Sequence, residues 1–194
     1  MTIDQSALDR FIVGIRPPVI AVTTHCDGRD NGMIILSGAA GSVIPDAMRL
    51  SINICKSNFT HDLVTQSGVF AMHMLASGDE AALARSVEIV QTLGGLTGRD
   101  GDKMAGLNIK RGITGAPILT DALSVVECRV IKAFDCDEMT FFLGDVAGNE
   151  KLAKGMPLSA VQLWGALPPE WTHDYERRHT DGLQAEARKA RGLA

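Results

Sequence analysis

The segment "MRLSINICKSNFTHDLV", residues 48–64, changes from a strand pattern to a helix pattern within a few positions. Apolar and polar side chains alternate over residues 48–55, as they do in a strand with two unlike faces. Residues 58–67 then fit a short helix, and Gly68 is a typical stop signal. The segment therefore predicts a strand that leads directly into the N-terminus of a helix.

Polar side chains gather at this junction: Lys56, Ser57, Asn58 and Thr60. The first turn of a helix has unpaired N–H groups and a partial positive charge, which together favour an anion. A phosphate group is one candidate ligand. The alternative is that Ser57 or Asn58 only caps the helix while Lys56 is solvated. These residues alone leave both interpretations open.

The chain has 194 residues, enough for one well-buried core and few for two domains. Its net charge of −4 gives no reason to expect nucleic acid as a ligand. The four cysteines are scattered without a CxxC pair, which argues against a zinc site or disulfides and favours a reducing cytoplasm. No signal peptide and no apolar run of about 20 residues is seen, so we expect a soluble, cytoplasmic protein without membrane contact.

Strand-length apolar or alternating segments dominate the chain and are separated by turn signals rich in Asp, Gly and Asn. Apart from residues 48–55, these segments are 19–25, 33–37, 69–75, 124–134, 139–146 and 158–164. Helical patterns are fewer, at 58–67, 78–93 and 181–193. Because helices and strands do not alternate regularly, we expect a mostly β fold, an antiparallel barrel with a few peripheral helices.

The predicted domain covers residues 1–167. A charged tail, residues 168–194, contains few apolar residues and either frays or packs against a partner subunit. The glycine-rich stretch 92–117 is expected to be a long loop, which is either functional or a surface excursion.

A run of small residues, 37–42 ("SGAAGS"), permits close approach of another group to the backbone. A flat ring system and tight barrel packing both fit this pattern. A GxGxxG fingerprint, a phosphate-binding GxxxxGK[ST] loop and hydrolase motifs are all missing from the sequence. Among the histidines, His73 is expected to be a satisfied core residue, and His25 and His179 are expected to be solvated.

The linear order of the motifs is more informative than any one of them. The segments "VTTHCDGRDNGMIILSGAAGSVIPD", "INICKSNFTHDLVTQSGVFAMHML", "DKMAGL", "GAPILTDALSVVECRV" and "MTFFLGDV" follow one another along the chain. In this order they resemble the flavin reductase-like family, whose fold is the FMN-binding split barrel. The resemblance covers roughly residues 17–148.

The resemblance implies a Greek-key split β-barrel that forms a homodimer and holds a flavin. FMN is favoured over FAD because no adenosine site is evident. No catalytic side chain and no metal is expected, since the flavin itself carries out electron transfer. The implied flavin-binding residues are Ser37, Gly38, Ala39, Asn53, Cys55, Lys56, Ser57, Asn58 and Thr60.

Position 139 departs from the family pattern. Members that use NAD(P)H often have a histidine before the late strand, where this chain has Met139. Methionine cannot replace the hydrogen-bond donor of an imidazole. The sequence therefore favours an FMN-binding oxidoreductase that exchanges electrons with a redox protein partner through bound flavin. The alternatives are an NAD(P)H-dependent flavin reductase that supplies a monooxygenase, and a non-catalytic flavin-binding module.

Overall fold

The computed structural model describes residues 5–16, 18–42 and 44–193. Residues 1–4, Pro17 and Val43, which the predicted domain included, lie outside the described residues. The strands are β1 Ile20–Cys26, β2 Arg29–Ile35, β3 Ala39–Ala40, β4 Arg49–Cys55, β5 Val69–Met74, β6 Ala76–Ser77, β7 Ile109–Arg111, β8 Pro117–Leu119, β9 Ser124–Cys136, β10 Met139–Lys151 and β11 Met156–Pro157. The helices are α1 Gln5–Gly14, a 3-10 turn Pro45–Ala47, α2 Phe59–Ser67, α3 Glu80–Gly95, α4 Ala160–Ala166 and α5 Pro169–Ala190.

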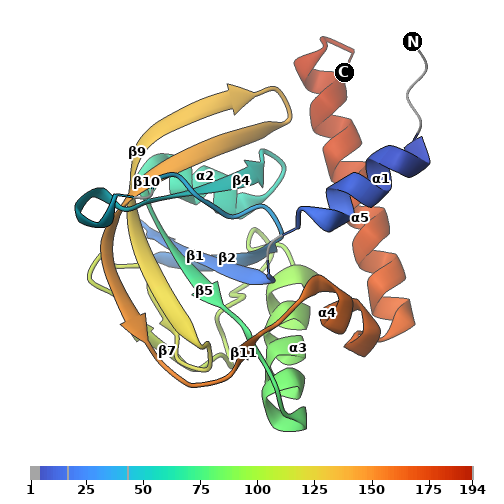
Figure 1. Ribbon diagram of the computed structural model, residues 1–194. Coiled ribbons are helices and arrows are strands. Elements are labelled where there is room, and N and C mark those ends of the chain that lie inside the picture. The colour runs from blue at the N-terminus through green and yellow to red at the C-terminus, as the bar shows by residue number, and fades with distance from the viewer. Residues whose placement is uncertain (1–4, 17, 43, 194) are drawn as a thin grey trace.

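Seven strands form one antiparallel sheet in the order β2-β1-β5-β9-β10-β4-β3. The sheet curls strongly, α2 packs against β1 and β2 within the curl, and α3, α4 and α5 lie together to one side of the sheet (Figure 1). Over the part of the chain that the structure describes, no ladder joins the edge strands β2 and β3, so the sheet does not close into a full barrel. The predicted mostly β, antiparallel fold with a few peripheral helices is confirmed.

The curled sheet encloses an apolar core to which six of its strands contribute. Strand β4 is buried on both faces: Ile52 and Ile54 are 0% exposed, and Ser51 and Cys55 are 3% exposed. A strand with one solvated face would expose the second pair. The second face of β4 therefore packs against other parts of the protein or opens to a cavity.

Helix α2 follows β4 as the sequence predicts. Asn58 is the N-cap residue with an extended backbone, but its side chain makes no capping hydrogen bond. Gly68 ends the helix in the left-handed conformation at φ 68°, which favours glycine. The N-terminus of α2 is therefore not capped by a side chain.

One of two expectations near the C-terminus is wrong. Residues 158–164 were expected to form a strand, but α4 begins within this range, at Ala160. Ser159 and Gln162 form a capping box there. The expected helix at 181–193 is confirmed, but it begins earlier, because it is the second half of α5, a single helix of 22 residues. Helix α5 packs beside α3 in the same chain (Figure 1).

Candidate functional site

A cavity of about 340 Å³ opens at the N-terminus of α2, and we call it the α2 cavity. It lies between β2, the end of α3, the following loop and α5. The residues that line it are Asn31, Met33, Ile34, Ser57, Asn58, Phe59, Thr60, Leu93, Gly94, Leu96, Thr97, Gly98, Lys103, Tyr175, Arg178, His179 and Gly182. None of these residues is acidic, which suits an anionic ligand.

A buried hydrogen bond links β2 to the first turn of α2 at this cavity. Asn31 Nδ2 donates to Thr60 Oγ1 at 2.9 Å, and both residues are 1% exposed. Asn31 Oδ1 is buried and has no hydrogen-bond partner among the described residues. Because Thr60 accepts this bond, its own hydroxyl proton is available to a ligand. An unpaired buried acceptor is costly, so it points to a missing donor.

Lys103 supplies a cation to the α2 cavity and is only 6% exposed. No described carboxylate forms an ion pair with it. Burial, and secondarily the charge of Arg178, lower the pKa of Lys103 to about 8. A buried lysine without an acidic partner is unfavourable unless an anion binds beside it. The "DKMAGL" motif contains this residue, but sequence reasoning did not assign it to the site.

A second cavity, of about 260 Å³, lies against β4, and we call it the β4 cavity. Ser37, Asn53 and Cys55 line it, as does Met139. Asn53 Oδ1 is buried and unpaired within the described chain. The second face of β4 is thus directed partly into a cavity that contains an unsatisfied acceptor.

The two cavities adjoin and share six lining residues: Met33, Ile34, Asn58, Gly94, Tyr175 and His179. Cys55 Sγ, in the β4 cavity, lies 3.1 Å from Ser57 Oγ, in the α2 cavity. Together the cavities form an elongated site with a cation and a helix N-terminus at one end. The other end is mostly apolar and offers the guanidinium of Arg16 and a few amide and hydroxyl groups.

Helix α5 forms one wall of both cavities. Trp171 stacks on Tyr175 with ring centroids 5.1 Å apart, and Tyr175 stacks on His179 at 5.9 Å. Trp171 and Tyr175 also pack against Gly94 of α3, where a side chain would crowd them. The tail therefore covers the site within its own chain.

Of the predicted binding residues, Ser37, Asn53 and Cys55 line the β4 cavity, and Ser57, Asn58 and Thr60 line the α2 cavity. Three others line neither cavity. Gly38 packs toward Met72 and Ile20, which agrees with tight barrel packing. Ala39 is exposed in β3.

The third of these residues, Lys56, also points elsewhere. Its Nζ forms an ion pair with Asp135 at 2.7 Å. The pKa of Lys56 is raised, chiefly by this hydrogen bond. Lys103, rather than Lys56, is the lysine that faces the α2 cavity.

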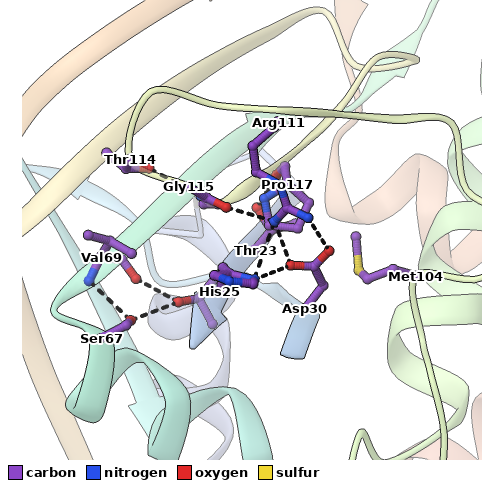
Figure 2. A network of polar contacts seen from close by, with 12 residues as sticks. Thr23, His25, Asp30, Ser67, Val69, Met104, Arg111, Thr114, Gly115 and Pro117 are labelled. Atoms are coloured by element: carbon purple, nitrogen blue, oxygen red, sulfur yellow. Dashed lines mark hydrogen bonds and ion pairs between the residues drawn. The ribbon is translucent and has the colours of Figure 1, made fainter. Parts of the chain in front are cut away.

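A separate polar cluster lies at the β1–β2 hairpin (Figure 2). Asp30 accepts two hydrogen bonds from Arg111, at 2.6 and 2.9 Å, and is 2.6 Å from His25 Nδ1. The expectation that His25 is solvated is therefore wrong. Both carboxylate oxygens of Asp30 have partners within the protein. Through the pair with Arg111, the cluster holds the β1–β2 hairpin against β7.

The prediction that His73 is a satisfied core residue is confirmed. His73 is 0% exposed, with Nδ1 3.2 Å from the Ala21 carbonyl and Nε2 accepting from the Leu119 amide. Burial lowers its pKa to about 4, so the ring is neutral. Over the described residues, no group of His, Cys, Asp or Glu is arranged to hold a metal, and no helix is long and apolar enough to cross a membrane.

Comparison with known proteins identifies the family. The model of the flavin reductase like domain matches residues 14–162. The chain belongs to the flavin reductase-like family. The matched segment contains β1 through β11 and the first three residues of α4, and it ends before α5.

Three similar proteins illustrate this flavin reductase-like relationship. A ferric-chelate reductase (NAD(P)H) from Archaeoglobus fulgidus is 28% identical over 132 residues, which are 68% of this chain and 73% of that protein. The reductase subunit of a flavin-dependent monooxygenase from Rhodococcus jostii is 25% identical over 179 residues, 89% and 84% of the two chains. The structure of nitrilotriacetate monooxygenase component B from Mycobacterium thermoresistibile is 23% identical, covers 79% of each chain and has a TM-score of 0.65. This last likeness shows the shared fold.

Proposed function

We propose that this protein is an FMN-binding oxidoreductase whose flavin occupies the α2 and β4 cavities. The observation that carries the proposal is the buried, unpaired Lys103 beside the uncapped N-terminus of α2. A phosphate group has the charge and acceptor oxygens that this arrangement lacks. The membership of the flavin reductase-like family supports a flavin as the molecule that carries the phosphate.

The residues present fit the parts of a flavin. Lys103, Ser57, Thr60 and the first-turn amides of α2 would hold the phosphate. Asn53 and Ser37, in the adjoining β4 cavity, would bind polar edges of the ring, and Asn53 Oδ1 would gain a donor. The bound flavin supplies the electron transfer. The protein orients it and excludes water, so no acidic, basic or nucleophilic side chain is required.

FMN is proposed rather than FAD because the cation-bearing cavity is bounded by α5 at Gly182, next to Ser57. We further propose a homodimer in the cytoplasm. The flavin domain would comprise residues 1–167, and residues 168–194 would be an appended tail that also packs on the dimer partner. These assignments follow from the family resemblance and the composition of the chain.

A second candidate function is an NAD(P)H-dependent flavin reductase that supplies reduced flavin to a monooxygenase. The similar proteins from Archaeoglobus fulgidus and Rhodococcus jostii favour it, since their names record NAD(P)H use and a monooxygenase reductase subunit. Met139 in the β4 cavity favours the first candidate, in which a redox protein partner exchanges electrons with bound flavin.

Stopped-flow absorbance of the flavin-loaded protein separates the candidates. Rapid bleaching of the flavin band by NADH or NADPH would support the reductase. Bleaching by dithionite or a protein reductant, with slow or no reaction with NADH and NADPH, would support the electron-transfer flavoprotein. A flavin that binds but exchanges electrons with none of these would indicate a non-catalytic binding module. Failure of the purified chain to bind any flavin would contradict all three.

A further inference from the structure

Helix α5 lies outside the segment that matches the family model, yet one of its faces lines both cavities. The lining residues lie at positions 171, 175, 178, 179 and 182, a spacing of three or four that places them on one side of a helix. We propose that α5 completes the phosphate site of this chain and that Arg178 provides its second cation. This inference rests on the flavin function proposed above.

Arg178 has hydrogen-bonding capacity left for a ligand. Its Nε donates to Asp174 Oδ2 at 2.8 Å. Within the described chain, its two terminal nitrogens have no hydrogen-bond partner, and the side chain is 38% exposed. Because a guanidinium carries five donors in a planar fork, the pair with Asp174 leaves a donor edge that can bind phosphate oxygens.

Two cations, Lys103 and Arg178, therefore line a cavity that contains no carboxylate among its described lining residues. Among the described residues, Lys103 has no ion pair, and the carboxylate bound to Arg178, that of Asp174, lies outside the cavity lining. Like charges that face one space are unfavourable unless an anion binds between them. A phosphate monoester, which is close to a dianion at neutral pH, matches the charge of this pair.

The approach of α5 to α2 is close because residue 182 is glycine. A Cβ atom at this position would lie 3.1 Å from Ser57 Oγ. Glycine inside a helix is less stable than alanine, so the sequence accepts a local penalty where α5 meets the N-terminus of α2. Arg178 lies one turn before Gly182 on the same side of α5, and both residues line the α2 cavity together with Ser57 and Thr60.

This arrangement makes phosphate recognition depend on a helix outside the family domain. The ligand class is a flavin with a terminal phosphate monoester. The affinity for riboflavin, which lacks the phosphate, should not depend on the charge at position 178. The two flavins therefore provide an internal comparison for any variant of α5.

The test is isothermal titration of the full-length chain with FMN and with riboflavin, comparing Arg178→Gln with Arg177→Gln. Arg177 is a matched control because it also pairs with Asp174 but does not line either cavity. We expect Arg178→Gln to lower the affinity for FMN about tenfold, as for the loss of one charge-assisted hydrogen bond. Its effect on riboflavin, and both effects of Arg177→Gln, should stay within about twofold. Arg178→Lys should restore part of the FMN affinity.

Equal FMN affinities for the two glutamine variants would overturn the role of Arg178, as would an equal loss for FMN and riboflavin. The flavin affinities of the wild-type chain show whether only the role of Arg178 is wrong or the proposed function as well. If the wild type prefers FMN over riboflavin and Arg178→Gln retains that preference in full, only the α5 inference fails. If the wild type shows no preference or binds neither flavin, the proposed phosphate site itself is contradicted.

Discussion

Asn31 in β2 and Thr60 in α2 are joined by a buried hydrogen bond of 2.9 Å, although 28 residues separate them in the sequence. The bond fixes the helix N-terminus against the sheet and leaves the Thr60 hydroxyl proton free for a ligand. The same contact thus contributes to the stability of the fold and to the geometry of the candidate phosphate site.

Replacing Thr60 with valine tests this dual role. Thr60→Val removes the acceptor for Asn31 Nδ2 and should lower the free energy of unfolding by about 1–3 kcal/mol, the cost of an unsatisfied buried donor. The substitution should also weaken the binding of FMN more than the binding of riboflavin. Urea denaturation and calorimetric titration measure the two effects. Thr60→Ser keeps the hydroxyl and is the control; identical behaviour of the valine and serine variants would refute the proposed role.

Lys103→Met should stabilise the ligand-free protein. The pKa of Lys103 is lowered to about 8, mainly by burial, so the charged lysine disfavours folding at pH 7. Methionine has a similar length without the charge, and we expect a gain of about 1–3 kcal/mol near neutral pH. Lys110→Met is the control, since Lys110 is exposed and paired with Glu150. A Lys103→Met variant that is less stable than wild type would contradict this account of the lysine.

The same pKa predicts a pH profile for the ligand-free protein. A folded-state pKa below the unfolded value means that the unfolded chain binds more protons between the two values. The wild type should therefore recover stability relative to Lys103→Met as the pH rises from about 8 toward 10.5. Urea denaturation of both proteins across this range gives the difference directly. A stability difference between wild type and Lys103→Met that stays constant with pH would show that Lys103 is not the titrating group.

Asp30 should stabilise the fold only above acidic pH. Burial acts to raise its pKa, but the hydrogen bonds and charges of Arg111 and His25 outweigh burial, so the pKa is lowered from 3.8. A carboxylate with a lowered folded-state pKa contributes stability above the unfolded value, and this is lost as the pH falls through the folded value. The stability difference between wild type and Asp30→Asn should be full near pH 6 and shrink below about pH 4. Asp100→Asn, at an exposed loop position, is the control substitution.

Gly94→Ala probes the packing of α5 on α3. Alanine in a helix is favoured over glycine by about 1 kcal/mol, but a Cβ at position 94 would lie 3.2 Å from Trp171 and 3.4 Å from Tyr175. We expect this crowding to cancel the gain and to change tryptophan fluorescence. Gly165→Ala in α4, where the space is open, should show the helix gain alone. Equal stabilisation by both substitutions would mean that α5 does not pack against Gly94.

Local patterns predicted most of the fold. The alternation at residues 48–55 and the glycine at 68 placed β4 and α2 correctly, because these signals lie within the elements themselves. The segment 158–164 failed because its short apolar run fits a buried strand as well as a helix. The capping box of Ser159 and Gln162 was the signal that could have decided it.

The sequence predicted only part of the candidate site. The motif at residues 56–60 indicated a phosphate site, but the choice of Lys56 as its cation rested on sequence proximity, and its side chain pairs with Asp135 instead. Lys103 and Arg178 come to the cavity from distant segments. Only the packing of the loop after α3 and of α5 brings them together, and no local pattern encodes that packing.

The most direct test of the central claim is the affinity of the wild-type chain and of Lys103→Gln for FMN and riboflavin, measured by calorimetric titration. We expect the wild type to bind FMN at least about tenfold more tightly than riboflavin. We expect Lys103→Gln to remove most of this preference without weakening riboflavin binding. Equal affinities of the wild type for the two flavins, or a preference for FMN that survives in Lys103→Gln, would contradict the central claim.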